Sequence, residues 1–286
     1  HLVHGGLPGI LRTWPHGTPA LEFIKRECED PAAAVFSVPE SSLLAEFPSP
    51  DQARRVLEAV GSGDRTQAAI AAAAGGRQGG VPSGALSQLL HRLVEEKRVL
   101  AVDSPLSARP GKPALYRVED PSLRLYLAML RAAQELARRG QWTAAFRLVE
   151  RRWTAWRGRA VEPLVRRSLE LAGAAGHLPW PGVEAVGGWW NRQFNPEVDL
   201  VGADRGPVAR SIYFAGSVKW LGSPFDDHDL AELHAAAPQV PGFSPGESGL
   251  VIVTRSGMGT RVDQRRVDLI WGPSDVIAAW QVGEAA

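Results

Sequence analysis

The run RSIYFAGSVKWLG, residues 210–222, most constrains what this chain can fold into. Its apolar residues predict a buried β-strand, although Lys219 lies within it. Two further strand-like runs precede it, GGWWNRQ at 187–193 and NPEVDLVGAD at 195–204. Turns rich in Pro, Gly and Asp separate the three runs, so together they predict a three-stranded meander.

Helices and further strands are predicted on both sides of this meander. RAVEPLVRRSLELAG (159–173) predicts a helix with Glu162 in its first turn, and DDHDLAELHAAA (226–237) predicts a helix capped by Asp226 or Asp227. SGLVIVTRSG (248–257) is almost entirely apolar, which is typical of a strand inside a sheet. VDLIWGPSDVIAAWQ (267–281) predicts a short strand and a closing helix. Residues 159–286 therefore predict an α/β sandwich domain. Neither GxxxxGK[ST] nor GxGxxG occurs, so no phosphate-binding glycine loop is predicted.

Residues 49–118 predict three helices, at 51–63, 64–76 and from 83 onward, followed by a β-hairpin with a Pro/Gly-rich tip. This order is typical of a winged helix, whose third helix enters the DNA major groove while the basic tip meets the phosphate backbone. The alternative is a winged helix that contacts only protein. The candidate DNA-binding residues are Ser87, Gln88, His91 and Arg92 on the outer helix face, and Arg109 and Lys112 at the tip.

The remaining segments are predicted to be helical. Residues 1–48 read as short helices broken by Gly and Pro. Residues 119–158 combine an apolar stripe with arginines interleaved with tryptophans. Such a pattern suits phosphate clamps beside stacking surfaces, but it is more typical of arginine stems lying along a core helix.

Composition excludes several classes of protein. The net charge is +1, so any nucleic-acid site must come from local clustering of charge. The single cysteine, Cys28, excludes an internal disulfide and fits a reducing, cytoplasmic location. No apolar run is long enough to span a membrane, and no signal peptide is visible. Because the chain begins at His1 without Met, we expect it to be part of a longer protein.

Glu162, GGWW, EVDLV and GSVKW, in this order, resemble the PD-(D/E)xK (restriction-endonuclease-like) nuclease superfamily. They are similar in particular to the nuclease-like domain at the C terminus of archaeal-type AAA/STAND ATPases. HGGLPGIL (4–11) resembles the lid of such ATPases, and YRVEDPSLRLYLAML (116–130) resembles their middle region. The resemblance implies a lid remnant at 1–48, a winged helix at 49–118, connecting helices at 119–158 and a nuclease-like domain at 159–286. It also implies that ATP binds only an ATPase core before residue 1.

The resemblance assigns roles to individual residues. Nucleases of this superfamily hold Mg²⁺ with two strand acids, and a lysine two residues after the second acid assists the reaction. Asp199 matches the first acid, Lys219 the lysine and Glu162 the helix acid, but Ser217 replaces the second acid. The main hypothesis is therefore a degenerate nuclease-like domain that binds DNA.

Two alternatives stay open. The first is an active, metal-dependent deoxyribonuclease in which another acid reaches the metal. Some restriction enzymes with a strand serine use an acid from the next helix, which points to Glu232 here, with Asp229 one turn earlier. Glu197, on the same strand face as Asp199, is a further candidate for this role. The second alternative is a protein–protein interaction scaffold. The oligomeric state is not predicted.

Overall fold

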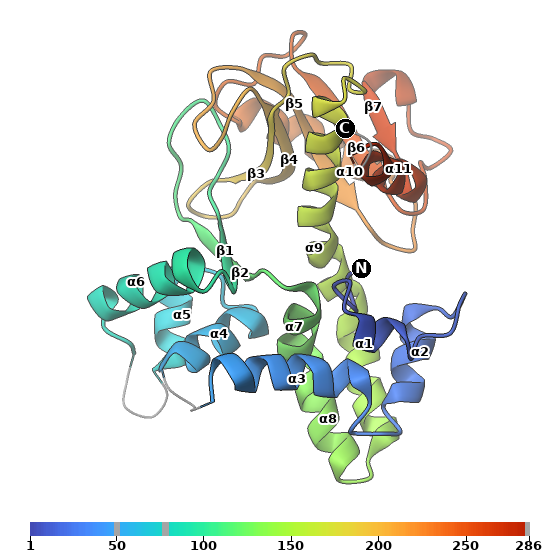
Figure 1. Cartoon of the computed structure of the whole chain (residues 1–286). Helices are drawn as coiled ribbons and strands as arrows, with labels where there is room; N and C mark the ends of the chain where they lie inside the picture. The colour runs from blue at the N-terminus through green and yellow to red at the C-terminus, as the bar shows by residue number, and fades with distance from the viewer. Residues whose placement is uncertain (49–51, 76–79, 284–286) are drawn as a thin grey trace. The chain divides into compact units, whose positions relative to one another are not determined.

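The computed structural model describes residues 1–48, 52–75 and 80–283 (Figure 1). The chain forms two compact units. Unit 1 comprises His1–Val102 and Leu115–Trp156, and unit 2 comprises Asp103–Ala114 and Arg157–Ala286. The expected boundary between residues 48 and 49 and the expected end of the second helix at residue 76 fall on or beside residues outside the described ranges.

Unit 1 is mostly helical. Its helices α1 (Pro8–Leu11), α2 (Ala20–Glu27) and α3 (Ala34–Glu46) cover the expected N-terminal segment. They are followed by α4 (Gln52–Ser62), α5 (Gln67–Ala74) and α6 (Ser83–His91), which continues as the π-helical turn η2 (Arg92–Glu96). A two-stranded sheet joins β1 (Leu100–Asp103) to β2 (Leu115–Val118). The remaining helical elements are α7 (Pro121–Leu125), η3 (Tyr126–Leu130), α8 (Arg131–Arg138) and the beginning of α9 (Trp142–Ala174).

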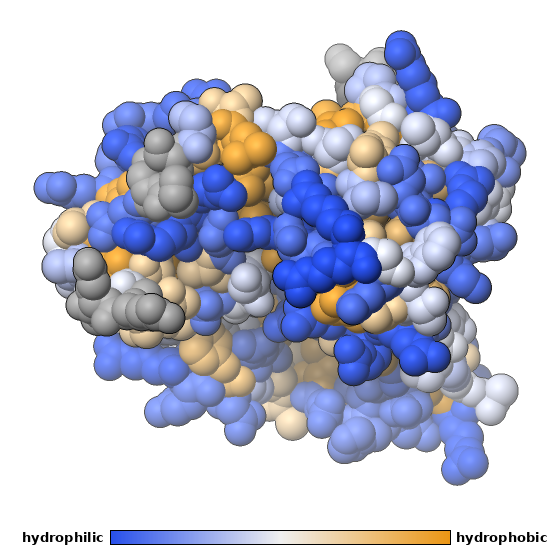
Figure 2. All heavy atoms as spheres, turned by 90° about the horizontal axis from the view of Figure 1, so that it is seen from below, coloured by the Kyte–Doolittle hydropathy of each residue, from blue (hydrophilic) through white to orange (hydrophobic). Residues whose placement is uncertain are grey.

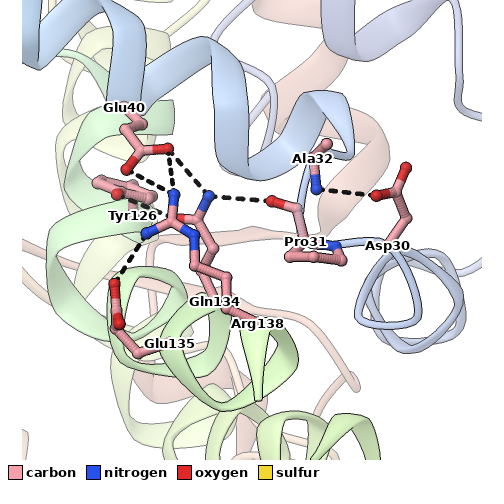
Figure 3. A network of polar contacts seen from close by, with 8 residues as sticks. All are labelled: Asp30, Pro31, Ala32, Glu40, Tyr126, Gln134, Glu135 and Arg138. Carbon is pink, nitrogen blue, oxygen red and sulfur yellow. Dashed lines mark hydrogen bonds and ion pairs between the residues drawn. The ribbon is translucent and has the colours of Figure 1, made fainter. Parts of the chain in front are cut away.

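A polar network ties α3 to the helices that follow β2 in unit 1 (Figure 3). The Gln134 side chain is 1% exposed, and its amide donates to Glu40 and to the Pro31 carbonyl, both at 3.0 Å. Gln134 also accepts a hydrogen bond from the Tyr126 hydroxyl at 3.0 Å. Burial and the charge of Glu40 raise the pKa of Tyr126 to about 12. A buried amide is stable here because its donors and its acceptor are satisfied.

Unit 2 is built on a five-stranded mixed sheet. Its strands are β3 (Ala185–Trp190), β4 (Glu197–Ala203), β5 (Ile212–Lys219), β6 (Gly249–Thr254) and β7 (Leu269–Trp271), in that spatial order. β3, β4 and β5 pair antiparallel, as the meander predicts, while β5, β6 and β7 pair parallel. Every residue of β6 is buried, which confirms that this apolar strand lies inside the sheet.

Helices accompany this sheet. α10 (Asp227–Ala236) contributes Leu230 and Leu233 to the core that contains Ala215 of β5 and Ile252 of β6. α11 (Pro273–Gly283) lies beside α9 (Figure 1). Ser168 of α9 joins these two helices, because its hydroxyl accepts a hydrogen bond from the Trp280 indole at 2.8 Å.

Two features of the chain path differ from what the sequence predicts. Glu162 does not lie in the first turn of a helix, because α9 runs unbroken from Trp142 through Pro163 to Ala174. The expected tip of the hairpin, Asp103–Ala114, belongs to unit 2. There the Leu106 amide donates to the Gly188 carbonyl of β3 at 2.8 Å. Leu106 is itself part of the unit 2 core. Burial of this apolar side chain favours packing of the Asp103–Ala114 segment against unit 2.

One face of the molecule can be assessed for exposed apolar side chains. On the face shown in Figure 2, hydrophilic residues predominate and hydrophobic ones occupy small separate areas. Isolated exposed apolar side chains such as Leu44 and Trp142 are ordinary features of a folded surface. None of the helices described has both the length and the apolar character that a membrane span requires.

Gly216 of β5 provides a test of the sheet. A Cβ at this position would lie 2.4 Å from the carbonyl oxygen of Val251 in β6, and a backbone atom of a paired strand cannot move aside. We expect Gly216→Ala to lower the free energy of unfolding by about 1–3 kcal/mol or more, as measured by urea denaturation. Gly222→Ala is the matched control, since a Cβ there meets nothing within 4 Å. Equal stability of the two variants would contradict this close approach.

Candidate functional site

Asp199 and Ser217 face one another across the pairing of β4 with β5. The register pairs Leu200 with Gly216, so the next antiparallel pair is Asp199 with Ser217. The Ser217 hydroxyl donates to Asp199 Oδ2 at 3.1 Å. Ser217 therefore occupies the place where the resemblance puts the second acid, directly opposite the first.

Asp199 accepts a second hydrogen bond from the protein itself. The backbone amide of Val218 donates to the same oxygen, Asp199 Oδ2, at 2.8 Å. Burial raises the pKa of the Asp199 carboxyl, while the hydrogen bond from Val218, the charge of Arg166 and the hydrogen bond from Ser217 act in the opposite direction. The effect of burial is the largest, because removing a carboxylate from water disfavours its charged form.

Lys219 is held by α10. Its ammonium group makes an ion pair with Asp229 and lies 3.7 Å from Asp226. Asp226 is the N-cap of α10 and forms a reciprocal capping box with Asp229, whose carboxylate accepts the Asp226 backbone amide at 2.7 Å. The lysine side chain is only 13% exposed, so this pairing takes place in a partly desolvated environment. The cap of the helix and the strand lysine thus form one polar cluster.

Glu162 is connected to Asp199 through Arg166. One guanidinium nitrogen of Arg166 lies 3.2 Å from the Glu162 carboxylate, one helical turn earlier in α9. The Arg166 Nε donates to the backbone carbonyl of Asp199 at 3.0 Å. The arginine is 11% exposed, so it positions the acid of α9 beside β4 through largely buried contacts.

The two acids considered as replacements are both exposed residues. Glu232 lies 3.2 Å from His228 in α10, and their side chains are 69% and 81% exposed. Glu197 is the first residue of β4. Lys219 is instead paired with Asp229 of α10 and lies near Asp226, the N-cap of this helix. The assignment of Glu232 to a metal remains a prediction.

The candidate DNA-binding residues fall in both units. Ser87, Gln88, His91 and Arg92 are exposed on α6 and η2 of unit 1, while Leu86 and Leu90 are buried on the opposite side of α6. Ser87 accepts a hydrogen bond from Gln67 at 2.7 Å. Arg109 and Lys112 are also exposed, but they lie in the Asp103–Ala114 segment of unit 2.

The side chains around Asp199 do not form a complete ligand set for Mg²⁺. Among the described residues, no three His, Cys, Asp or Glu side chains gather where they could hold a metal ion. Asp199 supplies one carboxylate, and Ser217 supplies a neutral hydroxyl, which is a weak ligand for a hard divalent cation. The arrangement instead satisfies Asp199 with protein donors and Lys219 with protein acids.

Comparison with known proteins gives no match, since no protein-family model, no curated protein and no solved structure matches this chain.

Sequence reasoning missed two members of this cluster. Asp226 was expected only as a helix cap, but it also lies near Lys219. Arg166 was not singled out. The signal available for Asp226 is its spacing of three residues from Asp229, which is the spacing of a capping box and links both acids to the start of one helix. No local pattern marks Arg166, because its contact with β4 joins residues far apart in the chain.

The raised pKa of Asp199 predicts how stability depends on pH. In the folded state the carboxyl holds its proton more tightly than in the unfolded chain, whose carboxyl pKa is about 4. The free energy of unfolding should therefore fall as pH rises from about 4 through the folded-state pKa. Asp199→Asn, which can accept both hydrogen bonds through its amide oxygen, should remove this loss. We expect the variant to gain stability relative to the wild type between pH 4 and pH 7, as measured by urea denaturation.

Asp204→Asn is the matched control, with the opposite sign. Hydrogen bonds from the backbone amides of Ser211 and Arg210 lower the pKa of Asp204. The charged Asp204 carboxylate therefore adds to the free energy of unfolding above the pKa that this carboxyl has in the unfolded chain, and this contribution is lost as pH falls. A stability difference for Asp199→Asn that does not change with pH would contradict burial of a charged carboxylate.

Proposed function

We propose that this chain is a non-catalytic, DNA-binding region with a degenerate nuclease-like domain, acting together with an ATPase core. In this proposal unit 2 is a PD-(D/E)xK-like domain, and the α4–α6 helices with the β1–β2 sheet form a winged helix. The observation that carries the proposal is the hydrogen bond from Ser217 to Asp199, at the position that a second metal-binding carboxylate would need.

The topology of unit 2 supports the nuclease-like assignment. An antiparallel meander followed by parallel strands places Asp199 on β4 and Ser217 and Lys219 on β5. Side chains alternate along a strand, so Ser217 and Lys219 share one face. This is the placement of the acid, second acid and lysine that the resemblance implies.

Loss of catalysis follows from the chemistry of the cluster. Cleavage of a phosphodiester by this kind of site requires a metal that polarises the phosphate and lowers the pKa of a bound water. With Ser217 in place of an acid, one charged ligand is missing. Lys219 is also engaged, since Asp229 and Asp226 neutralise the charge that would otherwise act on the phosphate.

The DNA-binding part of the proposal is supported by α6. An exposed helix face that carries Gln88, His91 and Arg92 offers donors and acceptors to base edges and phosphates, while the opposite face is anchored by buried leucines. A fold alone does not fix function, so the face of α6 is the specific feature to test.

The relocated-acid nuclease is the second candidate. The observation that favours it is the contact between Asp229 of α10 and Lys219 of β5. Asp229 is therefore a better candidate than Glu232 for the acid that would replace the missing strand acid. In this candidate Asp199 and Asp229 would hold the metal, which would polarise the phosphate and lower the pKa of a bound water.

Restoring the missing carboxylate tests the degenerate site. We expect the wild type to bind no Mn²⁺ or Mg²⁺ in calorimetry, and Ser217→Glu to gain binding because a second carboxylate then faces Asp199. Ser217→Gln is the control, with the same size and no charge. Metal binding by the wild type that disappears in Asp199→Asn and in Asp229→Asn or Glu232→Gln would favour the active nuclease instead.

Salt-dependent binding of a labelled DNA duplex tests the winged-helix face. We expect binding by fluorescence anisotropy to weaken steeply with salt, and Arg92→Ala to reduce the slope of log K against log salt by about 1. Arg139→Ala is the control, since Arg139 is also exposed in unit 1 but follows α8. Absence of duplex binding would favour the protein-interaction scaffold.

A further inference from the structure

A small cavity in unit 2 lies away from the Asp199–Ser217–Lys219 cluster. Its volume is about 280 Å³, and it is lined by the start of β6, the end of α10 and the turns beside them. Gly249 and Leu250 contribute the β6 part of the lining. Lys219 pairs with Thr254, whereas Phe214 pairs with Gly249, so the cavity and the lysine lie at opposite ends of the β5–β6 pair.

Flat apolar side chains form much of the lining. Trp180 and Phe243 contribute rings, and Pro238 and Pro245 contribute further flat surfaces. Trp180 is fixed against the sheet, because its ring lies 5.1 Å from that of Phe214 between centroids. Rings held in this way offer a stacking surface at little entropic cost.

Gly249 allows this placement of Trp180. A Cβ on residue 249 would lie 2.2 Å from Cζ2 of the Trp180 ring. The backbone of β6 therefore approaches the indole more closely than any other residue would permit.

Polar groups with unused hydrogen-bonding capacity complete the lining. His234 Nε2 is buried and has no hydrogen-bond partner among the described residues. Burial lowers the pKa of His234, and the nearby charge of Arg266 lowers it further. Two other polar residues of the lining are already engaged, since Ser248 donates to the Ile212 carbonyl and Asp268 accepts from the Leu250 amide, both at 2.8 Å.

The charges of the lining select the kind of ligand. Arg266 contributes one positive charge, whereas Glu247 and Asp268 contribute two negative charges, so a phosphate inside the cavity is disfavoured. The volume lies just below the range of about 300–1,000 Å³ that is typical of sites for drug-sized ligands. A single flat, uncharged ring system with donors and acceptors around its edge fits both the charge of the lining and the volume of the cavity.

We propose that this cavity binds one nucleobase, with its faces against the aromatic and proline side chains and its edge toward His234 and Arg266. The base comes either from an unpaired nucleotide in a single strand or from a free nucleoside. This inference deepens the proposed DNA-binding function and rests on it for the choice of nucleic acid.

Calorimetric titration of the whole chain tests the proposal, using the four deoxynucleosides and short single-stranded DNA of each base. We expect at least one base to bind, and His234→Ala and Arg266→Ala each to weaken that binding about tenfold. His228→Ala is the matched control, because His228 lies on the same helix and does not line this cavity. Arg266 is exposed, so its variant keeps the test meaningful if His234→Ala fails to fold.

The outcomes separate the two proposals. Duplex binding without any binding of nucleosides or single strands overturns the nucleobase site and leaves the DNA-binding proposal intact. Nucleoside binding that is unchanged in His234→Ala and Arg266→Ala also overturns it, since the ligand then binds elsewhere. Nucleoside binding that depends on both residues, without any DNA binding, supports the cavity and removes the proposed DNA function.

Discussion

The close pairing of β5 with both of its neighbours is the constraint on which unit 2 depends. β5 pairs antiparallel with β4 and parallel with β6, and Gly216 lies where the backbone of β6 comes nearest. Once this register is set, the alternation of side chains decides the rest. Ala215 enters the core beneath α10, and Ser217 and Lys219 follow it on the same face.

This register brings the Ser217 hydroxyl directly opposite the Asp199 carboxylate. A glutamate at position 217 would place a second carboxyl against the half-buried Asp199, and a bound cation or a proton held by one of the two carboxyls would be needed to offset the repulsion. A hydroxyl donates to Asp199 instead and needs no metal. The hydrogen bond from Ser217 stabilises the charged form of Asp199, but burial has the larger effect and raises the pKa of Asp199.

Much of the sheet of unit 2 could be predicted from the sequence, because its signals are local. The meander, the interior position of β6 and the Asp226 cap of α10 each follow from alternation, apolar runs or capping residues. The unbroken α9 could not be predicted in this way, since Pro163 signals a helix start rather than a helix interior. The packing of Asp103–Ala114 on β3 was also missed, because it depends on contacts between distant parts of the chain.

In the candidate site, too, local sequence patterns predict which element a residue lies in, but not its contacts with distant parts of the chain. Asp199, Ser217 and Lys219 lie in strands, as the sequence predicts, but the sequence pattern does not say which residues contact each of them. Asp199 accepts a hydrogen bond from the backbone amide of Val218 in the neighbouring strand. Lys219 neutralises a carboxylate of the α10 capping box. Asp199 and Lys219 therefore each make contacts between elements that are distant in the chain, and these contacts alone give both residues a role in the folded structure.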